Sequence, residues 1–167
     1  MRLSFTLAVA FTVLALPLSA QGAQETGSTA IPSPLRDSIM APIKSLFDGM
    51  RTRDTAMMRA AFAPGTLLTQ LPRPGQPVKF ETVDGFLMSV ASGPPGPSFD
   101  EQIYDPEVRV DGALASVWTF YTFTAGTYSH CGIDAFQLVR TTTGWKITAL
   151  ADTRRQQGCA VDGKVKG

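Results

Sequence analysis

Two ionisable residues in the C-terminal third of the chain, His130 and Asp134, could take part in acid–base chemistry. His130 is the single histidine, and an imidazole titrates near neutral pH, which suits a general base or a ligand-binding group. Asp134 stands between Ile133 and Ala135, where a carboxylate needs a partner or a raised pKa. A histidine bonded to backbone and an aspartate paired with an arginine would explain the same residues without any activity, so both interpretations stay open.

The spacing of these residues limits how they can act together. Successive side chains of a strand point to opposite faces, so His130 and Asp134 would share one face and Cys131 would lie on the other. Four residues of strand separate the two positions by about 13 Å, which is too far for a direct hydrogen bond. We therefore expect them to line one cavity at two depths, and we do not expect Cys131 and His130 to form a dyad.

Aromatic residues near the two ionisable groups predict a small-molecule pocket. A pocket with aromatic walls and a few polar groups suits a small organic ligand, although an ordinary core uses the same residues. Trp118 and Tyr121 are three positions apart, so they cannot share a face of one regular strand. The predicted pocket residues are Tyr104, Trp118, Tyr121, His130 and Asp134.

The stretch that must position these residues, 113–151, has the composition of three consecutive antiparallel strands. β-branched and aromatic residues dominate it, and such residues fit a pleated, half-buried surface. Turns are predicted at Gly126 and Gly144. The pair Asp111-Gly112 predicts another hairpin, which joins the extended segment 98–110 to this sheet.

Helices are expected before the sheet, because apolar residues there recur at helical spacing. Asp54 and Thr82 are suitable N-caps for the second and third helices. Pro42 would kink the first helix, so that helix could instead begin near Ala41. Pro106 suggests a bulge or an edge position in the extended segment. The predicted helices are 35–50, 53–63 and 83–91, and short strands are predicted at 66–71 and 78–80.

Helices segregated from hairpin-connected strands indicate an α+β fold with a strongly curved antiparallel sheet. The order of two N-terminal helices, a short hairpin, a third helix and a long meander resembles the nuclear transport factor 2-like superfamily. The closing pattern ALASVWTFYTF…SHCGIDAFQLVRTTTGWKITALADTRR is similar to exported SnoaL-like and putative lumazine-binding-like members. The resemblance covers about residues 35–158, which form one expected domain.

The resemblance implies a cone-shaped sheet around a cavity, covered by three helices, and a homodimer formed through the outer sheet face. It does not specify an activity, because this fold hosts isomerases, dehydratases and plain binding modules. The superfamily's ketosteroid isomerases use a carboxylate base with a tyrosine and a second acid on the cavity wall. No set of positions here matches that pattern closely enough to carry those roles over.

The N-terminus has the pattern of a secretory signal peptide. Arg2 is followed by an apolar run from Leu3 to Leu16, and small residues precede a cleavage position after Ala20. The run is shorter than the ~20 residues of a spanning helix and ends at Pro17. We therefore expect residues 1–20 to be removed and the protein to be periplasmic or secreted, without stable membrane insertion. Residues 21–34 are predicted to form a flexible linker and residues 159–167 a polar tail.

Charge and motif content exclude several classes of function. The formal net charge is +1, which provides no basic field for nucleic acid. Two cysteines and one histidine are too few for a four-ligand structural zinc site. Cofactor-binding glycine motifs and the nucleophile elbow are also missing from the sequence. We expect no metal, no cofactor and no nucleic-acid partner.

The two cysteines leave two alternatives. Export would permit a disulfide between Cys131 and Cys159. Strand pairing about Gly144 would put Cys131 opposite roughly residue 154, so the tail would have to return to close the bond. Two free thiols are the alternative.

Three functions remain open at this point. The first is binding of a small, mostly apolar molecule without demonstrated catalysis. The second is a cofactor-independent isomerase or lyase that uses His130 and Asp134 for proton transfer. The third is a structural dimerisation module with a filled cone. A second ionisable group within hydrogen-bond reach of His130 or Asp134, in an open cavity, would favour the enzyme.

Overall fold

The computed structural model describes residues 31–71, 75–93, 96 and 98–159. The predicted signal peptide, most of the predicted linker and all but the first residue of the predicted tail lie outside these residues. Within the described ranges the chain forms three helices and six strands. In chain order they are α1 (Ser33–Thr52), α2 (Thr55–Ala61), β1 (Phe62–Leu71), β2 (Lys79–Thr82), α3 (Val83–Ala91), β3 (Asp100–Asp111), β4 (Leu114–Ala125), β5 (Tyr128–Thr141) and β6 (Gly144–Thr153).

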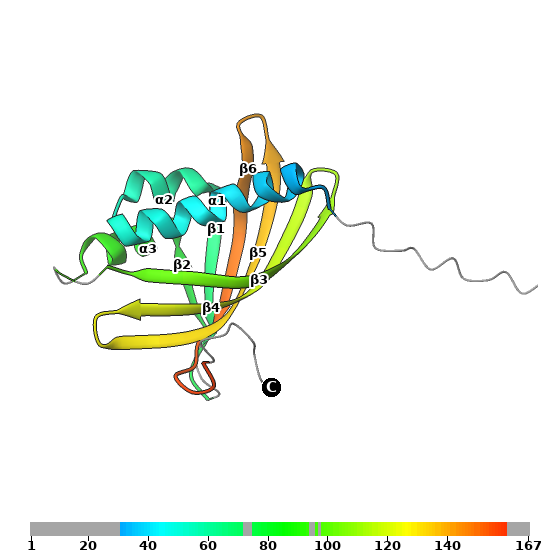
Figure 1. Cartoon of the computed structure of the whole chain (residues 1–167). Coiled ribbons are helices and arrows are strands. Elements are labelled where there is room, and N and C mark those ends of the chain that lie inside the picture. The colour runs from blue at the N-terminus through cyan, green and yellow to red at the C-terminus, as the bar shows by residue number, and fades with distance from the viewer. Residues whose placement is uncertain (1–30, 72–74, 94–95, 97, 160–167) are drawn as a thin grey trace, which may run out of the picture.

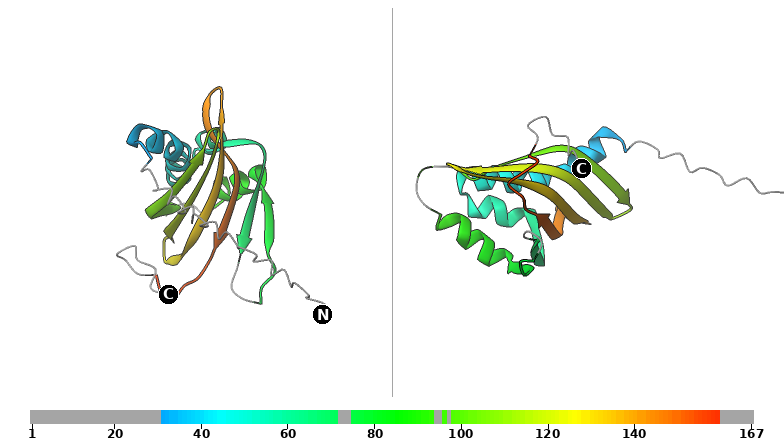
Figure 2. Two further views of the ribbon diagram at one scale, coloured as in Figure 1. Left: turned by 90° about the vertical axis from the view of Figure 1, so that its right-hand side faces the viewer. Right: turned by 90° about the horizontal axis from the view of Figure 1, so that it is seen from below.

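The strands form one curved sheet in the order β2-β1-β6-β5-β4-β3, with the three helices on one side of it (Figures 1 and 2). We call the face toward the helices the inner face and the opposite face the outer face. Neighbouring strands run antiparallel except for β1 and β6, which are parallel. The sheet is therefore mixed, and the predicted α+β class with a curved sheet under N-terminal helices is confirmed.

A bulge in β3 changes which residues of that strand face inward. The register with β4 shifts between Tyr104 and Glu107, and Asp105 has a positive φ of 46°. One extra residue reverses the alternation of side chains beyond it. Pro106 predicted a bulge or an edge position here, and the bulge is confirmed.

The first helix runs through Pro42 instead of beginning after it. Ile39 and Ile43, on either side of the proline, are fully buried. Packing of this apolar stripe outweighs the hydrogen bond that proline removes, because most helix stability in proteins comes from tertiary contacts. The other two predicted starts are confirmed: Asp54 caps α2 through the N–H of Met57, and Thr82 caps α3 through the N–H of Gly85.

The space between helices and sheet is filled at one end and open at the other. The apolar stripe of α1 packs against the inner face in one hydrophobic cluster. Its fully buried members include Ile39, Ile43, Val117, Phe136, Leu138 and Ile147. Toward the C-terminal end of α1 the sheet curls away, which leaves room for the site described below.

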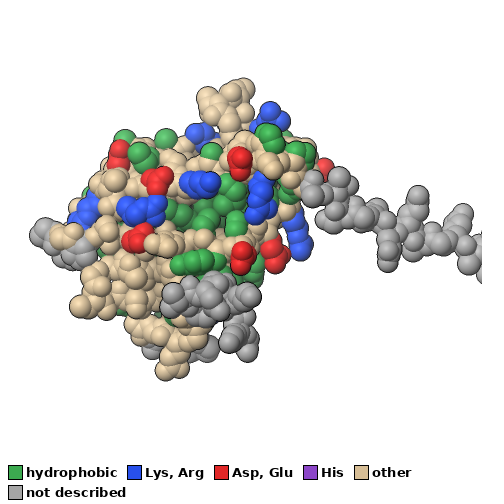
Figure 3. All heavy atoms as spheres, in the orientation of Figure 1, with side chains coloured by type: hydrophobic (Ala, Val, Ile, Leu, Met, Phe, Trp, Pro, Cys, Tyr) green, Lys and Arg blue, Asp and Glu red, His purple; other side chains and the backbone are tan. Residues whose placement is uncertain are grey.

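Positive and negative side chains are mixed on the visible surface of the helical layer. In Figure 3, Lys and Arg side chains alternate with Asp and Glu, and hydrophobic side chains lie between them. Among the described residues, every helix is too short or too polar to cross a bilayer.

Candidate functional site

A cavity of about 690 Å³ opens between the inner face of the sheet, the C-terminal half of α1, and α3. Its walls are largely apolar, and a volume of this size suits a small organic ligand. The apolar lining includes Phe47, Met50, Phe86, Val90, Phe123 and Leu150. The ionisable side chains of the lining come from β2, β3, β5 and the C-terminal end of β6.

Strand register brings these ionisable groups together from distant parts of the sequence. Glu101 pairs with Phe123, which pairs with His130. Farther along β5, Asp134 lies opposite Asp152 of β6. Paired residues on adjacent strands share a face, so three carboxyl groups and one imidazole project from the inner face into the same cavity.

Two of the carboxyl groups, Glu101 and Asp134, lie within hydrogen-bond reach of each other. Asp134 is 1% exposed, and its Oδ2 accepts no N–H or O–H donor among the described residues. Two carboxyl groups can bond only if one keeps its proton. Burial raises the pKa of Glu101 to about 7. Burial and the nearby Glu101 charge raise the pKa of Asp134 well above its usual value, so the pair holds a proton near neutral pH.

The third carboxylate, Asp152, has a cation of its own. Arg154 donates from Nε to Asp152 Oδ2 at 2.5 Å. The hydroxyl of Tyr121 donates to the carbonyl oxygen of Thr153 at 2.9 Å and lies 3.4 Å from Asp152 Oδ2. Burial raises the pKa of Tyr121, so its hydroxyl stays a donor.

His130 is held as a neutral imidazole among aromatic rings. It is 6% exposed, and its ring centroid lies 4.8 Å from that of Phe123 and 5.4 Å from that of Tyr128. Burial, helped by the charge of Arg154, lowers the pKa of His130 to about 4. Its Nδ1 has no hydrogen-bond partner among the described residues. A neutral imidazole offers one donor and one acceptor nitrogen.

Gly132 allows the end of β6 to close over the site. A Cβ on this residue would lie 1.7 Å from the carbonyl oxygen of Thr153, so only glycine permits this approach of two backbones. Beyond it, Cys131 and Arg155 exchange two backbone hydrogen bonds of 2.9 Å each. The prediction placed Cys131 opposite roughly residue 154, and the structure pairs it with Arg155. Arg154 is thereby fixed at the cavity.

Cys131 and Cys159 are joined by a disulfide in the structure, with their Cα atoms 5.6 Å apart. Cys131 lies on the opposite face from its neighbour His130, as strand alternation requires. The bond ties the segment after β6 back to β5.

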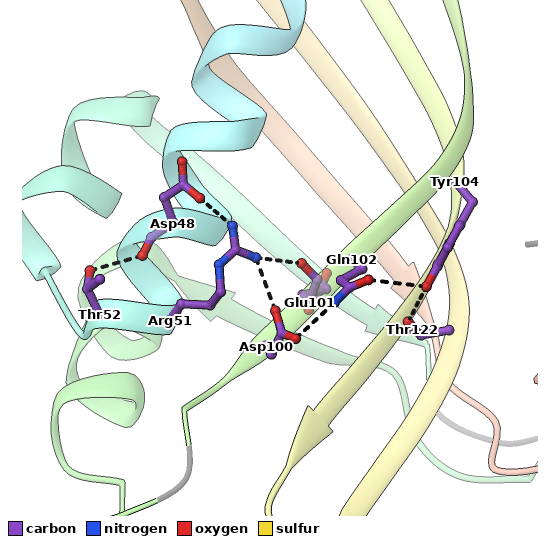
Figure 4. Close-up of polar contacts among 8 residues, drawn as sticks. All are labelled: Asp48, Arg51, Thr52, Asp100, Glu101, Gln102, Tyr104 and Thr122. Carbon is purple, nitrogen blue, oxygen red and sulfur yellow. Dashed lines mark hydrogen bonds and ion pairs between the residues drawn. The ribbon is translucent and has the colours of Figure 1, made fainter. Parts of the chain in front are cut away.

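Helix α1 positions the start of β3, where Glu101 is found. Arg51 donates from Nη1 to Asp100 Oδ1 at 3.1 Å and to the carbonyl oxygen of Glu101 at 3.2 Å. Figure 4 shows this guanidinium reaching from the helix to the strand, while Asp48 holds its other side. The backbone of Glu101 is therefore anchored to α1, while its side chain lines the cavity.

The family model described as putative lumazine-binding matches residues 35–150. The chain belongs to the putative lumazine-binding family. A search of curated proteins finds no match.

Solved structures of nuclear transport factor 2-like proteins share the fold of this family member. A nuclear transport factor 2-like protein of unknown function from Shewanella baltica has a TM-score of 0.60 at 14% identity, over 77% of this chain and 100% of that one. A putative dehydratase of the same superfamily from Streptomyces avermitilis has a TM-score of 0.59 at 15% identity, over 75% and 99%. A protein with a cystatin-like fold from Nostoc punctiforme gives 0.59 at 8% identity, over 76% and 96%. At these identities the likeness shows the fold alone.

In this putative lumazine-binding family member, three of the five predicted pocket residues come together and two do not. His130 and Asp134 line the cavity, and Tyr121 lies buried beside Asp152. Trp118 is 54% exposed on the outer face, because it alternates with the inward-facing Val117. Tyr104 precedes the bulge and turns outward, where its hydroxyl meets that of Thr122 at 3.1 Å (Figure 4). The expectation that Trp118 and Tyr104 line the pocket is therefore not met.

The sequence analysis predicted neither Glu101 nor Asp152 as a site residue. Counting back from the Asp111-Gly112 turn in regular register would put Glu101 on the outer face, and the bulge reverses this. Pro106 was the one signal that could have revealed the reversal. The sequence analysis considered an arginine as the partner of Asp134, and the side chain within hydrogen-bond reach of it is another acid.

The assembled groups of this family member can donate and accept protons. Two carboxyl groups that share a proton near neutral pH can act as a general acid and a general base. The described residues contain no cluster of three side chains suited to hold a metal ion. The geometry of the cavity side chains supports hydrogen bonding and proton transfer.

Proposed function

We propose that this domain binds a small, mostly apolar organic molecule in the cavity between the helices and the sheet. The observation that carries the proposal is the 690 Å³ cavity with apolar walls and buried ionisable groups at one end. Such pockets bury most of a ligand against apolar surface and orient it with a few polar contacts. The proposed function needs no cofactor.

Native mass spectrometry of the protein purified from the exported fraction tests this function. We expect the wild-type protein to carry the additional mass of a non-covalently bound ligand. In Leu150→Trp, a larger side chain enters the cavity from β6, and the mass should be lost. Leu114→Trp is the matched control, because Leu114 is 54% exposed on the outer face. Equal retention of the mass by both variants would place the ligand elsewhere and contradict the proposal.

Proton transfer is the second candidate function, and the Glu101–Asp134 pair favours it. Asp134 has a second ionisable group within hydrogen-bond reach inside an open cavity, which is the feature expected of an isomerase or lyase. His130 is buried and neutral nearby. In this reading the carboxyl pair abstracts and returns a proton.

Hydrogen exchange into the retained ligand separates catalysis from binding. The ligand recovered from the protein is returned to the protein in D₂O, and its carbon-bound hydrogens are followed by mass spectrometry. Catalysis predicts deuterium incorporation that falls at least a hundredfold in Asp134→Asn, since general acid–base residues contribute about 10²–10⁴-fold. Glu107→Gln, on the exposed outer side of β3, should exchange like the wild type. Binding without exchange would leave the first function alone.

The proposal includes a homodimer through the outer face of the sheet. Trp118 and Leu114 are each 54% exposed there, and exposed apolar patches mark interaction surfaces. Light scattering should give a dimer for the wild type and a monomer for Trp118→Glu. Met88→Glu changes an equally apolar exposed residue on α3 and should stay dimeric. A monomeric wild type would contradict this part of the proposal.

Export completes the proposal. The pattern of residues 1–20 and the Cys131–Cys159 disulfide both suit an oxidising compartment. The mature protein is periplasmic or secreted, and its N-terminal sequence should begin after Ala20. A mature chain that keeps residues 1–20 would contradict cleavage.

A further inference from the structure

The lining of the cavity contains more acids than bases. Four carboxyl side chains (Glu81, Glu101, Asp134 and Asp152) face two cationic side chains, Lys79 and Arg154. We call the end of the cavity lined by Glu101, Asp134 and Asp152 the inner end. The lining residue that brings a positive charge to it is Arg154, which is bonded to Asp152. Glu101 and Asp134 lie within hydrogen-bond reach of each other, and both also interact with the charges of Asp152 and Arg154. The inner end of the cavity therefore attracts positive charge.

His130 is a second, independent sign of a ligand. It is 6% exposed, lines the cavity and has an Nδ1 without a hydrogen-bond partner among the described residues. A buried polar atom without a partner is costly, so such an atom in a binding cavity points to a ligand group that completes it. Since the imidazole is neutral, one of its nitrogens can accept an N–H.

Aromatic rings form the wall beside these acceptors. Phe99 and Phe123 stack with centroids 6.0 Å apart and planes inclined by 20°. Tyr128 lies 6.4 Å from Phe123 and 5.4 Å from His130. The faces of such rings are negative, so they attract cations as well as flat apolar groups.

We propose that the ligand is an organic cation, a protonated primary or secondary amine on a flat apolar body. Its ammonium group bonds to the Glu101–Asp134 pair, a second hydrogen-bond donor on its body meets the His130 nitrogen, and the body lies against Phe123 and Tyr128. An anion would meet the excess of carboxylates, and like charges brought together cost several kcal/mol. A fully apolar ligand would leave the buried acceptors without donors. This inference deepens the proposed binding function and rests on it.

Three probes that share one naphthyl body test the inference. They are 2-naphthylmethylamine, which is a cation at pH 8, 2-naphthalenemethanol, which is neutral, and 2-naphthoate, which is an anion. Isothermal titration at pH 8 should give a cation affinity at least tenfold above that of the alcohol, with the anion weakest. Asp134→Asn and Glu101→Gln should each bring the cation to within threefold of the alcohol. Glu107→Gln should keep the tenfold preference.

The outcomes separate this inference from the function on which it rests. If the alcohol or the anion binds as tightly as the amine, the cation inference fails and the cavity function stands. If none of the three binds the wild type, both fail. Circular dichroism checks that the Asp134 and Glu101 variants fold. If neither folds, the wild-type comparison of the three probes decides alone.

Discussion

Replacing Glu101 with glutamine should stabilise the protein at mildly alkaline pH and leave it equally or slightly less stable at acidic pH. Glu101 titrates at about 7 in the folded protein, against 4.5 for an exposed glutamate. Between these values the folded chain binds more protons than the unfolded chain, so the free energy of unfolding falls as pH rises. At about 1.4 kcal/mol per pKa unit, ionised Glu101 costs the fold about 3 kcal/mol by pH 8. Asp134 adds to this loss, because its pKa is also raised.

His130 works in the other direction over nearly the same window. Its pKa falls from 6.5 to about 4 on folding, so the unfolded chain binds more protons there and stability rises with pH. That gain is about 3 kcal/mol between pH 4 and pH 6.5. In the wild type the contributions of Glu101 and His130 to the pH dependence of the free energy of unfolding therefore largely cancel. In Glu101→Gln the contribution of His130 is no longer offset by that of Glu101.

The magnitude of the Glu101→Gln effect follows from these two contributions. At pH 8 the variant should be about 2–3 kcal/mol more stable than the wild type, because it lacks the buried ionised carboxylate. At pH 4 both side chains are neutral, and the variant should equal the wild type or lose up to about 1 kcal/mol from its altered hydrogen bond. Arg154 and Asp152 stay paired in both proteins.

Urea unfolding followed by tryptophan fluorescence measures this difference, since Trp145 is 5% exposed in the fold. The titration is run at pH 4, 6 and 8 for the wild type, Glu101→Gln and Glu107→Gln. Glu107 lies exposed on the same strand, so its variant should differ from the wild type by no more than about 0.5 kcal/mol at every pH. A Glu101→Gln variant that is less stable than the wild type at pH 8 would refute the reasoning.

Three further changes test the packing around the site by the same titration. Gly132→Ala should cost more than about 3 kcal/mol, because its Cβ would overlap the Thr153 carbonyl oxygen at 1.7 Å. Gly85→Ala, inside α3, meets side-chain atoms at 3.3–3.4 Å and should change stability by no more than about 1 kcal/mol, and equal losses for the two would contradict the close approach at β6. Tyr121→Phe should cost about 0.5–1.5 kcal/mol, since the partly buried Thr153 carbonyl loses its hydroxyl donor, and an unchanged midpoint would show that this bond contributes nothing. Cys159→Ser opens a covalent loop with a sequence separation of 28 and should cost about 3–4 kcal/mol. Reaction of both wild-type cysteines with iodoacetamide in the absence of reductant would show free thiols and contradict this prediction.

Local signals were sufficient to predict most of the fold. The hairpin turns at Gly112, Gly126 and Gly144 connect β3 to β6 as expected, and these glycines have positive φ values of 55°, 64° and 107°. Backbone conformations of this kind favour glycine strongly, so a few residues determine the connections of four strands. The pairing of β1 with β6 could not be predicted in this way. It is parallel and joins residues about 80 positions apart, so no turn marks it.

The candidate site was predictable where strand alternation is regular and not where it is interrupted. His130 and Asp134 share the inner face, and Trp118 and Tyr121 lie on opposite faces, as a period of two requires. Glu101 was missed because one extra residue in β3 reverses its direction. Proline suggested an irregularity there, but a sequence does not show which way a bulge will turn the residues beyond it.

Irregularities of the sheet, rather than its regular parts, place the ionisable groups in the cavity. The bulge turns Glu101 inward toward Asp134, which lies on a regular strand. Gly132 allows the end of β6 to pack on β5, so that Arg154 reaches Asp152. Without these two features, the inner end of the cavity would keep Asp134 without its acidic partner and Asp152 without its cation. Burying three carboxyl groups together destabilises the fold, and regular strands with apolar residues would avoid that cost. The same irregularities that lower stability therefore assemble the only group of mutually interacting acids that lines the cavity in the described part of the chain, which is why we place the function there.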